Sequence, residues 1–314
     1  MDYNITQPSV NKITLRNTIL VTLFSALYLV LSAMFIGYKS DQLFLVVLFN
    51  GLYYTSAVSR KFILGFLIFI IFWIIFDSMK IVPNYLVNKI HIQELYQTEK
   101  KIFGILDAGT ILTPNEYLQK HSKTFLDLLA GFFYINWMPI PLLFAFYLYR
   151  KNRMQFLHFA LAFLFVNLIG FIVYYVYPAA PPWYVQQYGF GVKFDTPGNT
   201  AGLARFDAYF GIELFHSLYA KSSNVFAAMP SLHSAYPVIV LYYGLKNKLG
   251  LINIFFVLFM CGIWFSAVYT SHHYTLDVLA GICCAITGLF LFERILLKNK
   301  AFSRFLERYE NVIS

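Results

Sequence analysis

Two short segments carry the residues with the clearest chemical potential. The first reads MPSLHSAYP and places His233 just after Pro230. The second reads TSHHYTLD and places His273 four positions before Asp277. Histidine exchanges protons near neutral pH, and a free ring nitrogen can act as a nucleophile or bind a metal ion. These segments therefore predict acid/base or nucleophilic chemistry.

The PSLH segment is typical of a helix start. Proline suits the first turn of a helix because its missing N–H costs nothing there, so we expect the helix to begin at Pro230. Free N–H groups and the positive end of the helix dipole make such a start an anion site. We expect Ser231 and His233 to contact the anion. The alternative is that His233 only forms a hydrogen bond at the membrane interface.

The HHYTLD segment predicts a histidine and a carboxylate on one face of a helix. Thr270 or Ser271 can cap this helix. The i, i+4 spacing lets Asp277 hold one imidazole nitrogen of His273 and leave the other free. An ionisable residue inside an apolar span is a functional hypothesis because it is costly unless paired. Two alternatives are a structural His–Asp pair and a metal site that would use His272, His273, Asp277 and, as a further ligand, Asp207.

The composition determines what kind of protein must position these residues. The chain has 314 residues, of which 59% are hydrophobic and 12% are charged, whereas soluble domains carry about 25% charged residues. This excludes a water-soluble fold and predicts an all-α integral membrane protein. About eight apolar runs are long enough for transmembrane helices. They lie at roughly 17–37, 41–58, 62–79, 124–149, 155–178, 229–245, 250–270 and 274–297.

Two long connections, at 80–123 and 179–228, interrupt the series of apolar runs. Links between packed helices are usually much shorter. The second connection is rich in Pro, Gly, Trp and Tyr, which favours a folded extracytoplasmic cap over disorder. We expect a helix pair over 1–61, a catalytic membrane core over 62–297 and a basic cytoplasmic tail over 298–314.

The distribution of basic residues predicts the orientation of this multi-pass protein. Short cytoplasmic loops of membrane proteins carry an excess of Lys and Arg. With eight spans, one side receives 14 of the 24 basic residues, in the two terminal segments and the three short turns. They are Lys12, Arg16, Arg60, Lys61, Arg150, Lys151, Arg153, Lys246, Lys248, Arg294, Lys298, Lys300, Arg304 and Arg308. We therefore expect cytoplasmic termini, and His233 and His273 facing the lumen or periplasm.

The net charge of +9 fits this asymmetry, because anionic headgroups line the cytoplasmic surface of a membrane. No basic stripe with interleaved aromatic residues lies outside the membrane edges, so nucleic acid is not an expected partner. Membrane lipids are the expected partners, and the sequence leaves an accessory membrane subunit open.

The two motifs resemble the second and third signatures of the type-2 phosphatidic acid phosphatase superfamily, which read roughly PSGH and SRxxxxxHxxxD. The chain also reads YPAAPPWYVQQYG at 177–189 and TPGNTAGLARFD at 196–207. With these segments it is similar to the fungal inositol phosphorylceramide synthases, the targets of aureobasidin A. The resemblance is collinear over about 125–297. It implies a six-helix catalytic core that uses no metal ion and no cofactor.

The resemblance also implies roles for the motif residues. His273 would be the nucleophile that forms a phosphohistidine, and Asp277 would orient it. His233 would protonate the departing lipid oxygen and later deprotonate the incoming hydroxyl. Independently of the resemblance, we expect Ser231, two residues before His233, and His272, next to His273, to bind substrate.

The chain departs from the family pattern where phosphate charge is normally neutralised. Ala267 stands where the third motif usually has arginine, and no KxxxxxxRP motif precedes His233. We expect Arg205 to replace these groups because guanidinium binds phosphate through two parallel hydrogen bonds. Lys193 and Lys221 would contribute less. The alternative for Arg205 is a salt bridge to Asp207, which is itself a candidate substrate contact.

The PPWY segment leaves two interpretations open for Trp183 and Tyr184. They either shape the cap and an interfacial aromatic belt, or bind substrate. A cap rich in Trp and Tyr would exclude water, as transfer to a lipid alcohol requires.

The resemblance implies transfer of a phosphoinositol-type headgroup from phosphatidylinositol to ceramide, with release of diacylglycerol, in a Golgi or bacterial inner membrane. The alternatives are a lipid phosphatase or phosphodiesterase of the same superfamily and a non-catalytic lipid-binding or flipping protein.

Overall fold

The computed structural model describes residues 13–194, 196–220 and 224–314. Helices dominate this part of the chain. The longer ones are α1 (Leu15–Phe35), α2 (Ser40–Thr55), α3 (Ala57–Ser78), α4 (Gln93–Phe103), α6 (Thr124–Ile135), α7 (Pro139–Lys151), α8 (Arg153–Val176), α12 (Leu232–Lys246), α13 (Ile252–Tyr269), α14 (Thr275–Arg294) and α15 (Lys300–Ile313).

Shorter elements fill the two long connections and one terminal turn. The short helices are η1 (Asn84–Leu86), α5 (Pro114–Lys120), α9 (Pro182–Tyr188), η2 (Ala201–Leu203), α10 (Ala204–Phe210), α11 (Leu214–Tyr219) and η3 (Leu296–Lys298). Strands β1 (Ile105–Asp107) and β2 (Thr110–Leu112) pair antiparallel. This hairpin was not predicted from the sequence, because three-residue strands leave no readable alternation.

Every predicted apolar run is helical, and most have the dimensions of a membrane span. Five helices of the described chain are long and apolar enough to cross a membrane: α1, α3, α8, α13 and α14 with its extension to Lys298. The α6–α7 pair makes a sixth candidate, bent by 42°. Pro139 begins α7, and proline cannot continue a preceding helix, which explains the break. Helices α2 and α12, with 16 and 15 residues, are shorter than these spans.

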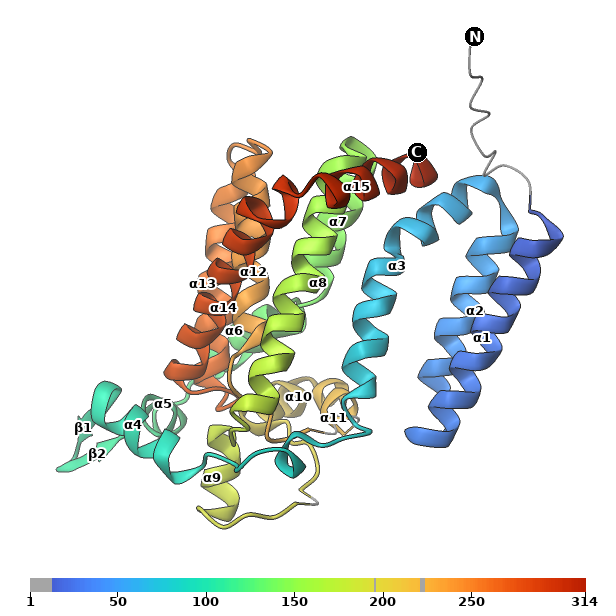
Figure 1. Cartoon of the computed structure of the whole chain (residues 1–314). Coiled ribbons are helices and arrows are strands. Elements are labelled where there is room, and N and C mark those ends of the chain that lie inside the picture. The colour runs from blue at the N-terminus through green and yellow to red at the C-terminus, as the bar shows by residue number, and fades with distance from the viewer. Residues whose placement is uncertain (1–12, 195, 221–223) are drawn as a thin grey trace, which may run out of the picture.

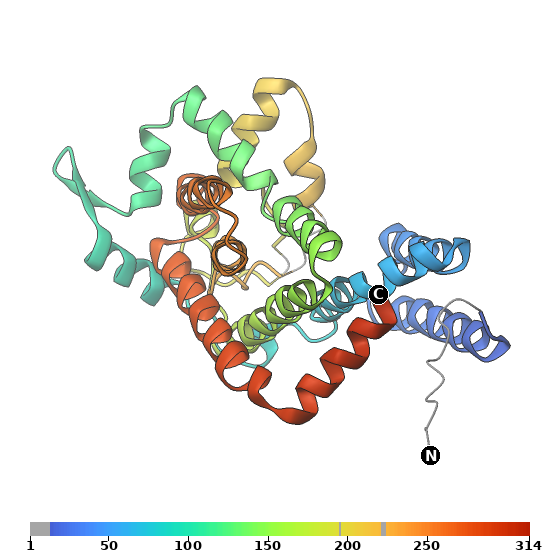
Figure 2. The same cartoon turned by 90° about the horizontal axis from the view of Figure 1, so that it is seen from above.

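Helix α8 lies at the centre of the bundle and packs against α3, α7, α12 and α14. Its phenylalanines at 156, 159 and 163 are fully buried. A helix that is apolar on all sides suits such a central position. The α1–α2 hairpin lies outside the bundle beside α3 (Figures 1 and 2). Most apolar side chains of α1 are uncovered.

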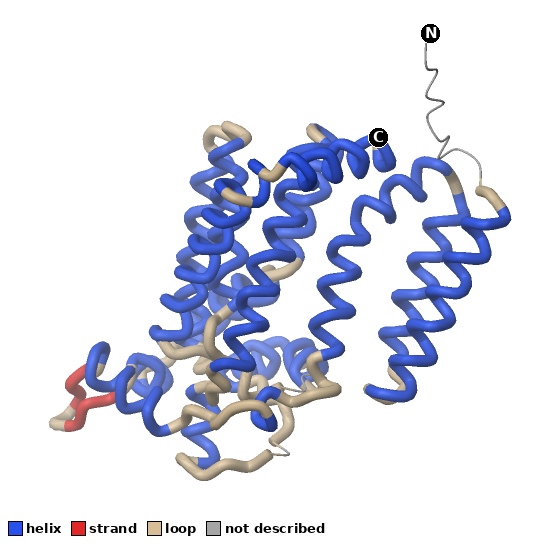
Figure 3. The backbone as a smooth tube through the Cα atoms, in the orientation of Figure 1, coloured by secondary structure: helices blue, strands red, loops and turns tan. Residues whose placement is uncertain are grey.

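The two ends of the bundle are built differently. Helix α15 lies across one end, together with the α2–α3, α7–α8 and α12–α13 turns (Figure 1). It is tied to α3 because the Tyr309 hydroxyl donates a 2.7 Å hydrogen bond to the Leu64 carbonyl. Both long connections gather at the opposite end, where most of the loop structure lies (Figure 3). The short basic turns thus share one end of the molecule, as the sequence predicted.

The two long connections interlock into one layer at that end. Ala179 forms isolated bridges with both His91 and Ala227. The Asn84 amide donates hydrogen bonds to the carbonyls of Tyr174 (2.9 Å) and Phe226 (2.8 Å). Backbone and amide pairing of this kind fixes the connections against the bundle and satisfies their buried polar groups.

Candidate active site

The fold brings the two signature histidines into contact. The Nδ1 atom of His233 lies 3.2 Å from the Nε2 atom of His273, although the residues are 40 positions apart. His233 lies in the first turn of α12, and His273 lies in the turn between α13 and α14. Both helix ends face the layer formed by the two long connections.

The turn that carries His273 is held by backbone carbonyls. The N–H groups of His272 and His273 both donate to the Ala267 carbonyl, at 3.2 and 3.0 Å. The Asn115 amide of α5 donates 2.8 Å hydrogen bonds to the carbonyls of Val268 and His273. The position where the family usually has arginine therefore serves here as a backbone anchor.

The predicted cap of α14 is wrong. Helix α13 ends at Tyr269, and Ser271 follows with a left-handed φ of 60° that redirects the chain. The next helix therefore begins only at Thr275, with Tyr274 at the N-cap position. A carboxylate oxygen of Asp277 accepts the Tyr274 N–H at 2.8 Å and so caps the helix from within.

His273 consequently precedes the helix, and the predicted shared helical face with Asp277 does not form. Its Nδ1 atom lies 3.7 Å from the Asp277 carboxylate but 2.9 Å from the Ala228 carbonyl oxygen. A carbonyl can only accept, so Nδ1 carries the proton and Nε2 keeps its lone pair. Burial lowers the pKa of His273, which favours the neutral ring. The carbonyl is thus the primary tautomer-fixing group.

Helix α12 begins at Leu232, two residues after the predicted start at Pro230. Ser231 is its N-cap because the serine side chain accepts the Ser234 N–H. The Ser231 N–H donates to the Asp277 carbonyl at 2.9 Å, which joins the start of α12 to α14. A Cβ atom on Gly281 would lie only 2.1 Å from the Ser231 carbonyl oxygen, so this crossing requires glycine.

Aromatic side chains surround His233 and His272. The Tyr134 hydroxyl lies 3.2 Å from His233 Nδ1, and the Trp137 ring packs edge-on against the same imidazole at 4.7 Å. The Nδ1 atom of His272 lies 3.0 Å from the Thr270 hydroxyl, whereas its Nε2 atom is buried without a hydrogen-bond partner. His272 is thus inside the site with one ring nitrogen available.

Arg205 pairs with a different acid from the one considered in the sequence. Its Nε atom donates to Asp127 at 2.6 Å, and the Tyr269 hydroxyl donates to the same carboxylate oxygen at 2.7 Å. Asp207 instead caps α11 by accepting the N–H groups of Phe215 and His216. The Nη2 atom of Arg205 is buried without a hydrogen-bond partner. The salt-bridge alternative with Asp207 is therefore wrong, and part of the guanidinium fork remains available.

The predicted residues of the second long connection mostly hold that connection in place. The Tyr184 hydroxyl donates to the Gly191 carbonyl and accepts the Lys193 N–H, so it holds the connection together. The backbone N–H of Trp183 donates a 3.0 Å hydrogen bond to the Ser271 carbonyl, beside the histidine turn. The Lys193 ammonium packs over the Tyr188 ring at 4.5 Å. Lys221 lies outside the described residues.

The metal site considered as an alternative lacks a suitable cluster of ligands in the described residues. Among residues 13–194, 196–220 and 224–314, no group of three or more His, Cys, Asp and Glu side chains is placed to hold a metal ion. Although His272, His273 and Asp277 are close in sequence, His272 turns toward Thr270 and toward the Tyr134 and Tyr219 rings.

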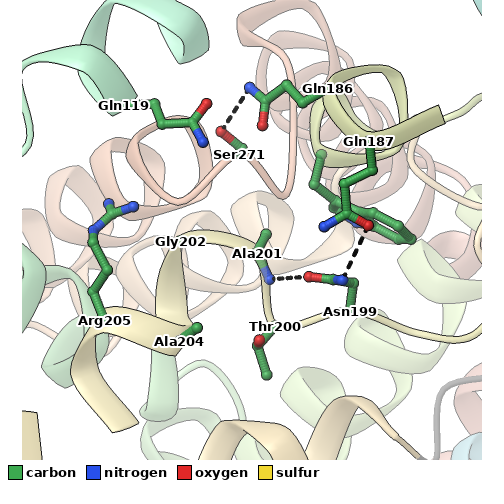
Figure 4. A pocket seen from close by; sticks show the side chains of 11 residues that line it. Gln119, Gln186, Gln187, Asn199, Thr200, Ala201, Gly202, Ala204, Arg205 and Ser271 are labelled. Carbon is green, nitrogen blue, oxygen red and sulfur yellow. Dashed lines mark hydrogen bonds between the residues drawn. The ribbon is translucent and has the colours of Figure 1, made fainter. Parts of the chain in front are cut away.

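A cavity of about 390 Å³ adjoins the histidine turn. Figure 4 shows it between α5, α9, the 199–205 segment and Ser271. The lining residues are Gln119, Trp183, Gln186, Gln187, Asn199, Thr200, Ala201, Gly202, Ala204, Arg205 and Ser271. Of the predicted substrate residues, Arg205 and Trp183 reach this cavity.

Sequence reasoning missed several residues that position the site. Glu99 of α4 is fully buried and accepts the N–H groups of Thr275 and Leu276, at 2.8 and 3.0 Å, at the start of α14. Tyr134, Asn115 and Asp127 were also missed. All four come from 80–149, ahead of the two histidine motifs, and only the folded chain places them at the site.

The chain matches known proteins over most of its length. Residues 105–291 match the PAP2 superfamily. The phosphoinositol dihydroceramide synthase of Bacteroides thetaiotaomicron is 46% identical over 301 residues, which cover 95% of this chain and 98% of that protein. The inositol phosphorylceramide synthase catalytic subunit AUR1 of Saccharomyces cerevisiae is 38% identical over 120 residues. This region covers 37% of this chain and 29% of the length of AUR1. No solved structure gives a significant match.

The chain therefore belongs to the PAP2 superfamily, in its branch of inositol phosphorylceramide synthase-like phosphotransferases. The predicted family is confirmed by the match over nearly the whole chain. The predicted class of enzyme, a membrane-embedded transferase of sphingolipid metabolism, is confirmed with it.

Proposed function

We propose that the chain transfers the phosphoinositol headgroup of phosphatidylinositol to ceramide through a phosphohistidine on His273. The observation that carries the proposal is the 3.2 Å contact between His233 Nδ1 and His273 Nε2, with the opposite nitrogen of His273 held by the Ala228 carbonyl. One histidine thus presents a lone pair where the other can exchange a proton. Relatives named as phosphoinositol dihydroceramide and inositol phosphorylceramide synthases support the choice of lipids.

In the first step, the Nε2 lone pair of His273 attacks the phosphorus atom of the donor. The bond between phosphorus and the diacylglycerol oxygen breaks, and protonated His233 gives its proton to that oxygen. Diacylglycerol leaves, and the phosphoinositol group stays bound to Nε2. Positive charge develops on the His273 ring, and the buried Asp277 carboxylate 3.7 Å away stabilises it.

In the second step, the primary hydroxyl of ceramide takes the place of diacylglycerol. His233, now neutral, removes the hydroxyl proton while the oxygen attacks phosphorus. The bond between phosphorus and Nε2 breaks, which releases inositol phosphorylceramide and restores the starting protonation of both histidines. Water must be kept out at this stage because it would hydrolyse the intermediate.

Phosphate charge is met by Arg205 and the start of α12 in this scheme. The unpartnered Nη2 atom of Arg205 supplies a charge-assisted hydrogen bond. The first N–H groups of α12 have no acceptor within the helix and point toward its N-terminal end. Ser231 positions these groups as the N-cap. The Thr270 hydroxyl donates to the Ser266 carbonyl and therefore accepts from His272 Nδ1, so Nε2 of His272 is left to accept a hydrogen bond from a substrate hydroxyl.

The membrane placement follows the same proposal. Eight spans cross the bilayer, a six-helix core lies within 62–297, and the layer formed by 80–123 and 179–228 caps the site on the lumenal or periplasmic side. Trp183 and Tyr184 shape this cap. Both termini are cytoplasmic, because the short basic turns share the α15 end.

Cysteine labelling tests this orientation in a background without Cys261, Cys283 and Cys284. Exposed Val192 in the cap and exposed Glu307 on α15 are each replaced by cysteine. A membrane-impermeant reagent should label Val192→Cys only from the lumenal or periplasmic face and Glu307→Cys only from the cytoplasmic face. The reverse pattern contradicts the orientation.

The activity is tested with purified protein, phosphatidylinositol labelled in its phosphate and ceramide, with products identified by mass spectrometry. We expect inositol phosphorylceramide and diacylglycerol in equal amounts, and acid-labile label on the peptide containing His273 after an early quench. Release of inositol phosphate with ceramide unchanged would show the hydrolytic alternative. Activity abolished by a chelator and restored by one metal ion would contradict the phosphohistidine scheme.

A further inference from the structure

The cavity beside the histidine turn is lined mainly by polar, uncharged side chains. Four amide side chains and two hydroxyls line it: Gln119, Gln186, Gln187, Asn199, Thr200 and Ser271. Among the described residues that line it, none is acidic, and Arg205 supplies the one positive charge. Neutral donors and acceptors around a single guanidinium match a ligand that has many hydroxyls and one anionic group.

The size and openness of the cavity favour a headgroup over lipid tails. Its volume of about 390 Å³ lies near the lower end of the roughly 300–1,000 Å³ range of ligand sites. Gln119, Gln186 and Gln187 are exposed, so the cavity opens toward the aqueous end of the molecule. Acyl chains would gain nothing from amide walls, because burying amides against hydrocarbon without hydrogen bonds costs free energy.

The cavity is fixed to the catalytic turn by backbone hydrogen bonds. The Gly202 N–H donates to the Thr270 carbonyl at 2.9 Å, and the Trp183 N–H donates to the Ser271 carbonyl at 3.0 Å. A ligand held here therefore has a set position relative to His272 and His273, which follow directly in the chain. Arg205 lines this cavity and keeps its Nη2 atom unpartnered.

Backbone strain is concentrated in the same place. Of the four non-glycine residues with positive φ in the described chain, Ala201 (45°) and Ser271 (60°) both line the cavity. Such conformations are costly and persist where the surrounding structure imposes them, often at ligand sites. Figure 4 shows Gln119 and Arg205 on one side of the cavity and Gln187 with Asn199 across from them.

We propose that this cavity binds the cyclic polyol ring of the donor headgroup, with Gln119, Gln187 and Asn199 hydrogen-bonding ring hydroxyls and Arg205 directed at the phosphate. The inference rests on the proposed function for the identity of the ring as inositol. It assigns donor selectivity to side chains that the signature motifs do not include.

The test replaces Gln119 and Gln187 by methionine, singly and together, which keeps side-chain length and removes the amide. Gln97→Met on α4, an exposed amide outside the cavity, is the matched control. The loss of one neutral hydrogen bond corresponds to a rise of about two- to tenfold in KM for phosphatidylinositol. The double variant should approach the product of the two effects, with kcat and the KM for ceramide changed less than twofold.

A second readout separates the ring from the phosphate. Soluble myo-inositol 1-phosphate should raise the unfolding temperature of the wild type, and of Gln97→Met, more than glycerol 3-phosphate does. The Gln119→Met/Gln187→Met protein should lose that difference. Equal effects of the two phosphates on the wild type, or an unchanged KM in the double variant, would overturn the assignment.

The two proposals fail in different ways. If the wild type transfers no phosphoinositol to ceramide, the proposed function fails, and the stability measurement with inositol phosphate still decides the cavity. If the wild type is active and the double variant keeps its preference for phosphatidylinositol over phosphatidylglycerol, only the cavity assignment fails.

Discussion

The histidine turn and the amide-lined cavity lie next to each other and are joined by backbone hydrogen bonds, yet their side chains differ in burial. Asp277 is fully buried and His273 is 6% exposed, and backbone carbonyls fix the turn. The cavity is lined by exposed glutamines whose contacts are side-chain hydrogen bonds, such as the 3.2 Å bond from Gln186 to the Ser271 hydroxyl. Backbone hydrogen bonds thus fix both the reacting nitrogen and the frame of the cavity, while the glutamine side chains that line the cavity are exposed.

This difference teaches where substitutions should matter most. A buried, backbone-held nucleophile tolerates little displacement, because reacting atoms must align closely. Exposed amides each contribute one modest hydrogen bond. Changes in the turn should therefore act on the rate of chemistry, and changes in the cavity should act on donor recognition.

The largest effect is expected for His273→Ala. Removing the nucleophile should lower transfer by at least about 10⁴-fold, as for loss of other catalytic nucleophiles. No label should remain on the protein after an early quench. His233→Ala should instead retain donor binding and release diacylglycerol slowly, because it lacks only the proton exchange. Full activity in His273→Ala would show that the histidine turn does not carry the nucleophile, which contradicts the contrast between the turn and the cavity.

Arg205→Lys should cause the next largest loss, about tenfold to a thousandfold in kcat, because a lysine ammonium cannot pair with Asp127 and also place a donor where Nη2 of Arg205 lies. Asp127→Asn is the control, since it removes the ion pair at 2.6 Å while keeping the guanidinium. It should lose less activity than Arg205→Lys. If Arg205→Lys and Asp127→Asn lose the same fraction of activity, Arg205 acts mainly through its ion pair with Asp127.

Asp277→Asn should lower kcat by a smaller factor, about tenfold to a hundredfold, through lost stabilisation of charge on the His273 ring. The Ala228 carbonyl still fixes the tautomer, and an asparagine oxygen can still accept the Tyr274 N–H. Kinetics and an unfolding curve measured on the same preparation separate the two roles. A loss as large as that of His273→Ala would mean that the carboxylate, not the carbonyl, sets the tautomer.

Gly281→Ala should have the smallest effect on chemistry and a clear effect on stability. The added methyl group would meet the Ser231 carbonyl at 2.1 Å, so α12 and α14 must separate slightly. Overpacking of this kind costs about 1–3 kcal/mol, and the shift of His233 should lower kcat severalfold. Gly51→Ala on α2, where nothing lies within 4 Å, is the helical control: it should leave kcat unchanged and raise stability by up to about 1 kcal/mol, because alanine favours a helix more than glycine does. Equal unfolding temperatures for the two variants would show that the crossing is not tight.

Much of the fold could be predicted from the sequence, because bilayer thickness imposes a length and composition on each span. The sequence predicted the apolar runs, the two long connections and the grouping of the short basic turns at one end of the molecule. The bend between α6 and α7 was not predicted, since Pro139 lies inside a continuous apolar run. The three-residue strands were also missed, because they give no alternation to detect.

The sequence by itself determined which side chains could react, because His233, His273 and Asp277 occur in short segments with recognisable spacing. The tertiary structure alone decided how they meet. The Ala228 carbonyl, 45 residues away in sequence, fixes the tautomer of His273, and Asp127 rather than nearby Asp207 pairs with Arg205. Hydrogen bonds of this kind depend on distances of about 3 Å between chain segments that no local pattern relates. The amide-lined cavity has the same origin, since its walls come from α5, α9, the 199–205 segment and the turn before α14.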